Sequence, residues 1–192
     1  MEGASSSAAR MRSQPASLIW VNRVVLPRPI FASWPPSCFR LTHRALLRVE
    51  PELELSDADA ELAHRRGVVV VTTLVGAPKL EKEARAQQDA LNARNLRRLL
   101  GHRVRLALGG DSYRQDSEAE ALCLDSLHVL SPSALLKLWT ESTAAAVYPD
   151  RRIGRLREGF EASFLVLAGD PLRDFGQVTQ ITRRVKQGRA LP

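Results

Sequence analysis

Two short apolar runs separated by a long helical pattern constrain the fold of this chain more than any other feature. Val68–Thr73 is almost entirely β-branched, which is typical of a strand buried on both faces. Val104–Leu108 is a second run of strand length. Between them, apolar residues recur at helical spacing from Pro78 to about Leu100. This order predicts a βαβ unit whose two strands are parallel neighbours in one sheet.

The second apolar run ends in Gly109, Gly110 and Asp111, which places a carboxylate just past the end of the predicted strand. In an α/β barrel, residues at the carboxyl ends of the strands build the active site. Glycines there allow the backbone to come close to a ligand or metal. Asp111 is therefore a candidate catalytic residue. The alternative is a turn in which Asp111 and Ser112 cap the next segment.

Three further helices are expected around this unit. Ser56 is a candidate N-cap, with Asp57 and Asp59 in the first turn, for a helix that runs to about Arg66 and ends at Gly67. A second helix is expected from Ser117 to about Leu127. A third begins at Ser131–Pro132, with serine as N-cap and proline in the first turn, and stops near Pro149.

The last part of the chain has a β pattern. Ala162–Ala168 is a predicted strand with an apolar centre, and Ile181–Val185 and Arg189–Leu191 flank the turn residues Gln187-Gly188. A glycine-containing pair between two such runs predicts a β-hairpin. A module of about 40 residues is too small to fold alone, so we expect it to pack on the rest of the chain.

Composition and charge limit the class of protein. An apolar content of 44% argues against disorder of the whole chain. No apolar run approaches the ~18 residues that span a bilayer. Cys38 and Cys123 are the only cysteines, which fits a reducing compartment and a cytoplasmic protein.

The net charge of +7 is unevenly distributed. Residues 1–49 contain seven arginines and one glutamate, a net charge of +6, whereas residues 50–192 contain 21 basic and 20 acidic residues, a net charge of +1. A basic nucleic-acid-binding surface on the main body is therefore not supported.

Residues 1–49 differ in character from the rest, because Ser, Ala, Arg and Pro accumulate there without periodicity. Three interpretations compete: a transit peptide, a secretory signal, and a non-native start upstream of a natural sequence that begins near Val49. The apolar patch Leu18–Leu26 is short and contains Asn22 and Arg23, which disfavours a secretory signal. We favour a disordered or non-native segment.

Several segments resemble the C-terminal part of metal-dependent amidohydrolases of the imidazolonepropionase-like group. The most specific is the tail, Ile153-Gly-Arg-Leu-Arg-Glu-Gly-Phe-Glu-Ala-Ser-Phe-Leu-Val-Leu-Ala-Gly-Asp-Pro-Leu172 followed by Val185-Lys-Gln-Gly-Arg189. Ser131–Thr140 with Ala144 and Ala145, Leu108–Ser112, and Val68–Leu74 resemble other segments of the same group. The resemblance covers residues 50–191.

The resemblance implies an α/β fold, namely the C-terminal portion of a (β/α)8 barrel with part of a small β-sandwich domain. It divides the chain into an unmatched segment at 1–49, the last barrel strands and helices at 50–150, and a β module at 151–192. It also implies a divalent metal, most simply zinc, that activates a water molecule for hydrolysis of a non-peptide carbon–nitrogen bond in a small amide or cyclic amide. Asp111 would bind the metal and act as general base.

The sequence departs from this group in its metal ligands. None of its four histidines, which are His43, His64, His102 and His128, forms the His-x-His pair of the group. His43 lies upstream of the Val68 strand, where a later ligand histidine is expected, and is a second candidate ligand. Ser163 stands where the group usually has aspartate. Because a catalytic zinc needs about three protein ligands, we expect this chain alone to be inactive.

Two alternative functions remain open. The chain could be a non-catalytic subunit or remnant that completes a barrel, with a separate N-terminal half or a second copy as partner. The third possibility, nucleic-acid binding through residues 1–49, predicts salt-dependent binding. It is not favoured, because the arginines and the aromatic residues of this segment show no regular interleaving.

Overall fold

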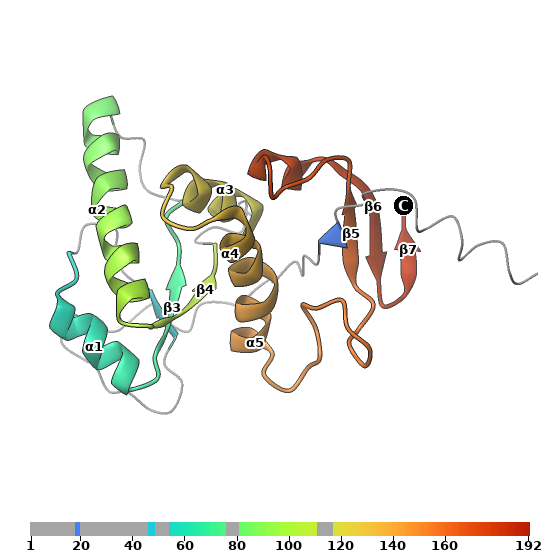
Figure 1. The fold of residues 1–192 in the computed structure, drawn as a ribbon, viewed down its shortest axis with the longest axis horizontal. Coiled ribbons are helices and arrows are strands. Elements are labelled where there is room, and N and C mark those ends of the chain that lie inside the picture. The colour runs from blue at the N-terminus through green and yellow to red at the C-terminus, as the bar shows by residue number, and fades with distance from the viewer. Residues whose placement is uncertain (1–17, 20–45, 49–53, 76–80, 111–116) are drawn as a thin grey trace, which may run out of the picture.

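The computed structural model describes residues 18–19, 46–48, 54–75, 81–110 and 117–192, with the backbone alone for the first two ranges. The elements follow one another in a mixed α/β order (Figure 1). They are β1 (Leu18–Ile19), β2 (Leu46–Arg48), α1 (Asp57–Arg65), β3 (Val69–Thr72), α2 (Lys82–Gly101), β4 (Arg105–Leu108), α3 (Ser117–Ser126), α4 (Pro132–Lys137), the π-helical turn η2 (Leu138–Ser142), α5 (Thr143–Val147), β5 (Phe164–Leu167), the 3₁₀ turn η3 (Phe175–Thr179), β6 (Ile181–Lys186) and β7 (Arg189–Leu191).

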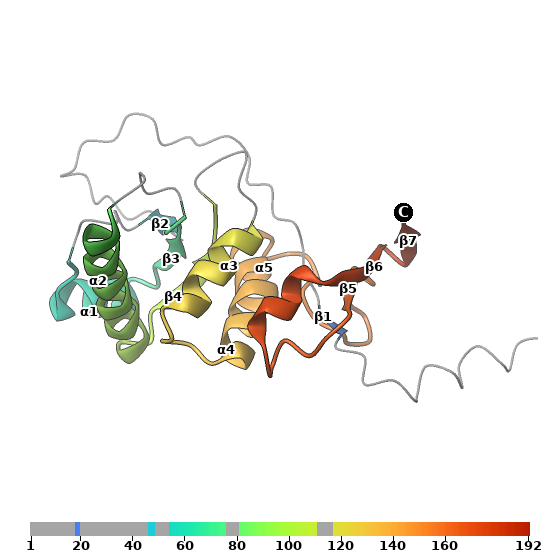
Figure 2. The same ribbon diagram turned by 90° about the horizontal axis from the view of Figure 1, so that it is seen from above.

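The first sheet is parallel and has the strand order β2-β3-β4. Val70 of β3 lies opposite Leu106 of β4, and Thr72 lies opposite Leu108. Helix α2 makes the crossover between these two strands, so the predicted βαβ unit is confirmed. Helices α1 and α2 lie on one side of the sheet (Figures 1 and 2).

The second sheet is antiparallel and has the order β1-β5-β6-β7. The predicted hairpin is confirmed: Lys186 pairs with Arg189, and the two turn residues Gln187 and Gly188 both have positive φ, 52° and 77°. Two consecutive residues of positive φ match the twist of the flanking strands. Strands β1 and β2 both lie within residues 1–49, and the division of the chain at residue 49 stays a prediction.

Helix α1 begins where the sequence predicts. The Ser56 side chain accepts the Asp59 amide, and the Asp59 side chain accepts the Ser56 amide, which together form a capping box. Helix α2, in contrast, begins at Lys82 rather than at the predicted Pro78. Glu81 has an extended backbone with ψ of 156°, so the helix cannot continue back through it.

The predicted helix from Ser131 to Pro149 is interrupted by a π-helical turn. Helix α4 starts with Ser131 as N-cap, and η2 then leads into α5, which ends at Val147. Within η2, the Thr143 amide donates to the Leu138 carbonyl, a span of five residues rather than four. Gly154, with φ of 87°, then packs against the Thr140 carbonyl, where a side chain would clash.

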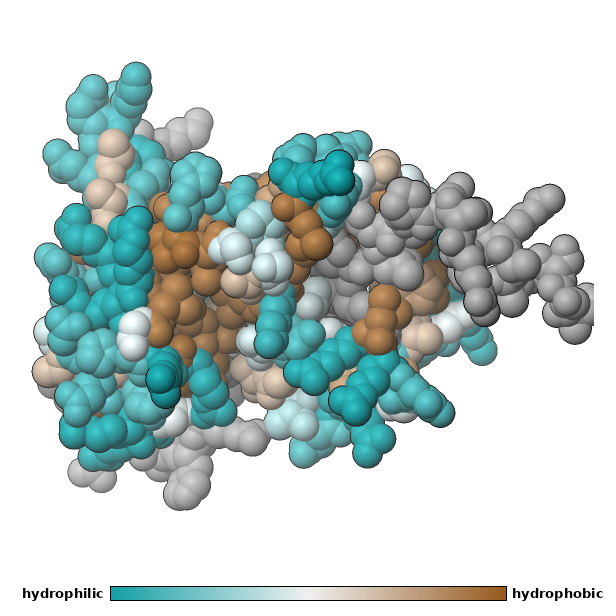
Figure 3. Space-filling view, viewed as in Figure 1, coloured by the Kyte–Doolittle hydropathy of each residue, from teal (hydrophilic) through white to brown (hydrophobic). Residues whose placement is uncertain are grey.

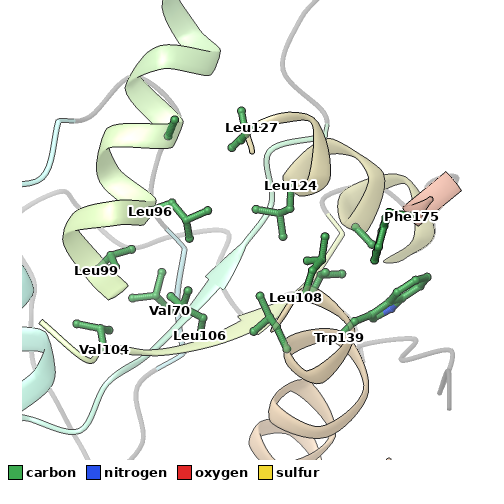
Figure 4. Packing of buried hydrophobic residues seen from close by; sticks show 14 of the residues in the cluster. Val70, Leu96, Leu99, Val104, Leu106, Leu108, Leu124, Leu127, Trp139 and Phe175 are labelled. Carbon is green, nitrogen blue, oxygen red and sulfur yellow. The ribbon is translucent and has the colours of Figure 1, made fainter. Parts of the chain in front are cut away.

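One apolar core joins both sheets. Leu124 of α3 and Leu135 of α4 are fully buried in this core. Figure 4 shows Leu124 beside other members of the cluster. The same cluster contains Trp139, Phe175 and Leu167, so the C-terminal β module packs on the helices that follow β4, as expected. None of the helices in the described part of the chain combines the length and the apolarity needed to cross a bilayer.

Candidate functional site

The carboxyl ends of β3 and β4 form the edge where the sequence places the candidate site. Because the two strands are parallel and Thr72 lies opposite Leu108, they end together. The Gly109 amide donates to the Thr72 carbonyl at 3.0 Å, which extends the pairing by one residue. Gly110 is the last described residue here, and Asp111 lies outside the described residues.

Gly109 is required by packing between the two strands. A Cβ atom at this position would lie 2.5 Å from Val71 Cγ1 and 3.3 Å from the Thr72 carbonyl oxygen. Any larger residue would push β4 away from β3 at the point where the chain leads into Asp111. The sequence suggested that these glycines let the backbone come close to a ligand or metal. At Gly109 the structure shows a close approach of β4 to β3.

Glu120 of α3 is a buried carboxylate at the same edge, and sequence reasoning missed it. Its side chain has no exposed surface. The Leu74 amide donates to both carboxylate oxygens, at 3.0 and 2.8 Å, and the Val75 amide donates to Oε2 at 2.9 Å. A signal was present in the sequence, because Glu120 lies four residues before Leu124 and so shares the apolar face of its helix.

Two threonine hydroxyls complete the polar groups at the end of β3. Within the described residues, Thr72 Oγ1 and Thr73 Oγ1 are buried without a hydrogen-bond partner. Thr72 also lines a cavity of about 40 Å³ between α2 and β3. Most of that cavity is apolar, and its lining includes Val70, Leu96 and Leu124. Figure 3 shows the apolar side chains that gather between α2 and the α3–α4 pair.

The histidines that the structure describes do not lie at this edge. His64 Nδ1 is 3.1 Å from the Arg103 carbonyl oxygen, and His102 Nε2 is 2.9 Å from Asp57 Oδ1, both near the amino end of β4. His128 is exposed and follows α3. His43, the second candidate ligand, lies outside the described residues. Among the residues described, no group of three or more His, Cys, Asp or Glu side chains could hold a metal.

An open hollow of about 510 Å³ lies between the end of α2 and the start of α1. It is lined by Arg94, Arg97, Arg98, His102 and Asp57. The hydrogen bond with His102 is the main cause that lowers the pKa of the Asp57 carboxyl; burial opposes it, and the charge of Arg98 adds a lesser lowering. These contacts join α1 to α2 at the amino end of β4, away from the carboxyl ends of β3 and β4.

Cys123 lies one turn after Glu120 on α3. Its thiol is half-buried, and burial is the main cause that raises its pKa, followed by the charge of Glu120. A thiol in this environment stays protonated at neutral pH, so Cys123 is poorly suited to act as a nucleophile.

No protein-family model and no curated protein sequence matches this chain. Solved structures do share its fold. A. niger ochratoxinase is 24% identical with a TM-score of 0.59, over 74% of this chain and 36% of that chain. An amidohydrolase is 24% identical with a TM-score of 0.56, over 71% and 37%. A prolidase in complex with N-methylphosphonate-L-proline is 23% identical with a TM-score of 0.55, over 71% and 38%.

The present chain spans well under half of the length of these structures. The imidazolonepropionase-like subgroup stays a prediction. The parallel β2-β3-β4 sheet with its crossover helix is consistent with part of a barrel. The chain therefore shares the fold of one part of these solved structures.

Proposed function

We propose that this chain forms the C-terminal part of a metal-dependent hydrolase that cleaves a carbon–nitrogen bond in a small amide or cyclic amide. One observation carries the proposal. β3 and β4 are parallel, end together, and are tied by the bond from the Gly109 amide to the Thr72 carbonyl, two residues before Asp111. In barrel enzymes this is the edge at which catalytic groups are presented.

Asp111 is the residue that we propose for the reaction. Its carboxylate would accept a proton from the attacking water, which is the general-base role. It would also be one ligand of the metal, for which zinc is proposed, with His43 as a second candidate ligand. The described residues alone do not fit a metal, because they contain no group of three or more ligating side chains. The remaining ligands would come from the rest of a complete protein.

The neighbours of known structure include enzymes whose names indicate amide substrates. One is a prolidase bound to a phosphonate derivative of proline, and another is an ochratoxinase. At 23% and 24% identity these likenesses show the fold alone. The substrate class, a small amide or cyclic amide, is therefore proposed from the sequence resemblance, and the individual substrate is to be identified by assay.

The test is a hydrolysis assay with N-acyl amino acids and cyclic amides in the presence of Zn²⁺. The chain alone is expected to give no turnover above the uncatalysed rate. Joined to an upstream polypeptide from its source genome that supplies the His-x-His strand, it should become active. The Asp111→Asn variant should then lose at least about a hundredfold in kcat, the lower range of general-base contributions. Equal activity of the joined D111N variant would contradict the assignment.

A further inference from the structure

The side chain of Thr72, the last residue of β3, is a buried polar group with an unmet hydrogen-bonding need. Thr72 is 8% exposed, and its Oγ1 makes no hydrogen bond to any of the described residues. A buried hydroxyl without a partner is costly, because it has given up its hydrogen bonds to solvent. The hydroxyl therefore needs a partner that the described protein atoms do not supply.

This hydroxyl lies on the side of β3 that faces helix α2. Side chains alternate along a strand, so Thr72 shares a face of β3 with Val70, which packs in the core with the leucines of α2. Thr73 lies on the other face with Val71, because both side chains approach the position of a Cβ on Gly109, at 3.4 and 2.5 Å. Of the two unpartnered hydroxyls, only that of Thr72 is therefore turned toward α2.

A cavity of about 40 Å³ lies between β3 and α2, and Thr72 is part of its lining. The apolar side chains of the lining, some of which Figure 4 shows, include Val70, Leu96, Leu99 and Leu124. Roughly 10–15 Å³ is enough to hold one water molecule, whereas pockets for organic ligands measure about 300–1,000 Å³. The size of this cavity admits water and excludes an organic ligand.

Asn92 of α2 brings a second polar group to the same cavity. Its side chain is 7% exposed, and its Oδ1 accepts a hydrogen bond from Gln88 Nε2 at 3.2 Å, which leaves its NH2 group as a donor. Asn95, the other asparagine of the lining, accepts the Leu55 amide through Oδ1 at 3.0 Å. The cavity therefore has the hydroxyl of Thr72 on its strand side and the amide of Asn92 on its helix side.

We propose that this cavity is the binding site of an internal water molecule that links Thr72 of β3 to Asn92 of α2. The water accepts a hydrogen bond from the Asn92 NH2 group and donates one to Thr72 Oγ1. Buried waters have two to four polar partners, whereas cavities lined by apolar groups alone stay dry. The site joins the crossover helix to its strand, and it does not depend on the proposed hydrolysis, because neither side chain has a part in that reaction.

The first test is a high-resolution crystal structure of the full chain. It should show one ordered water at hydrogen-bond distance, about 2.5–3.2 Å, from both Thr72 Oγ1 and Asn92 Nδ2. A Thr72 hydroxyl bonded directly to another protein atom would overturn the proposal, and so would a cavity without electron density for water.

The second test detects the water in solution. Water-selective NMR should show cross-relaxation between a long-lived water and the methyl protons of Val70 and Leu124, which line the cavity. Leu135 is the matched control, because it is fully buried and is not part of the lining, so its methyl protons should show none. Equal signals at all three residues, or no signal at Val70 and Leu124, would contradict the internal water.

Two variants of Thr72 test the role of its hydroxyl. Thr72→Val keeps the shape of the side chain and removes the hydroxyl, whereas Thr72→Ser keeps the hydroxyl and removes a methyl group. The cross-relaxation from water to Leu124 should fall at least about tenfold in T72V and should persist in T72S. The same result in both variants would overturn the assignment of the water to this hydroxyl. If T72V does not fold, the two measurements on the wild-type chain decide the proposal.

The stability of T72V gives an independent check through its sign. If a water bonds to the Thr72 hydroxyl, the midpoint of urea unfolding should fall in T72V, because the water and Asn92 lose part of their network. If the hydroxyl is buried without a partner, its replacement by a methyl group should raise the midpoint. A raised midpoint would therefore overturn the proposal.

Discussion

The backbone amide of Leu108 in β4 donates a hydrogen bond to the hydroxyl of Thr143 at 2.8 Å. The amide of the next residue, Gly109, points to the opposite side of β4 and donates to the Thr72 carbonyl of β3. Thr143 therefore satisfies a donor on the side of β4 that faces away from β3. The same hydroxyl donates to the Leu138 carbonyl at 2.8 Å, so one side chain joins the strand edge to the π-helical turn.

Replacing Thr143 with valine should destabilise the fold by about 1–3 kcal/mol, because a buried amide loses its acceptor. Thr143 is 1% exposed, so water cannot easily replace its hydroxyl as the acceptor of the Leu108 amide. The free energy of unfolding from urea titration measures the effect. Thr182→Val, at an exposed position of β6, is the matched control and should change stability by less than about 0.5 kcal/mol. Equal effects of the two variants would contradict this role of Thr143.

Gly109→Ala should destabilise the chain by about 1–3 kcal/mol, because the new Cβ overlaps Val71 Cγ1. Val71→Ala removes Val71 Cγ1, the atom with which the new Cβ would clash. The double variant G109A/V71A should therefore be more stable than the two single effects predict, with a coupling of at least about 0.5 kcal/mol. A thermal-unfolding double-mutant cycle measures this. Additive effects would show that the two positions do not meet.

Ser163 should control the acid sensitivity of the C-terminal sheet. The hydrogen bond from Ser163 is the main cause that lowers the pKa of Glu161, followed by the bond from Arg151. Ser163 also accepts the Gln187 amide at 2.9 Å, which fixes the β6–β7 hairpin turn. In Ser163→Ala the pKa of Glu161 should rise toward its ordinary value of 4.5, as followed by the carboxyl carbon shift in an NMR titration.

The sign of the pH effect follows from that direction. A carboxyl whose pKa is lowered in the folded state stabilises the fold above its ordinary value of 4.5 and loses that contribution as the pH falls through the folded pKa. The wild-type chain should therefore lose more stability than S163A as the pH falls below 4.5. A parallel pH dependence of the two proteins would contradict the role of Ser163.

The sequence predicted correctly those elements that depend on interactions between residues close together in the chain. The capping box of Ser56 and Asp59 involves residues three apart, and the hairpin turn at Gln187-Gly188 depends on backbone preferences of two residues. The crossover between β3 and β4 follows from the order of strand and helix.

Contacts between distant residues could not be predicted in the same way. Glu120 is buried because it meets Leu74 and Val75, 46 and 45 positions away. The π-helical turn places Thr143 against Leu108, 35 positions away, and no local pattern requires it. Asp111 and His43 lie outside the described residues, so their roles stay predictions.

The most direct test of the central claim is the source DNA upstream of the codon for Val49, translated in all three reading frames. We expect a frame continuous with residue 49 that encodes further alternating strands and helices, among them a strand with a His-x-His pair. Such a sequence would supply the metal ligands that the described residues lack. The absence of any such frame would contradict the claim that this chain is the C-terminal part of a single hydrolase.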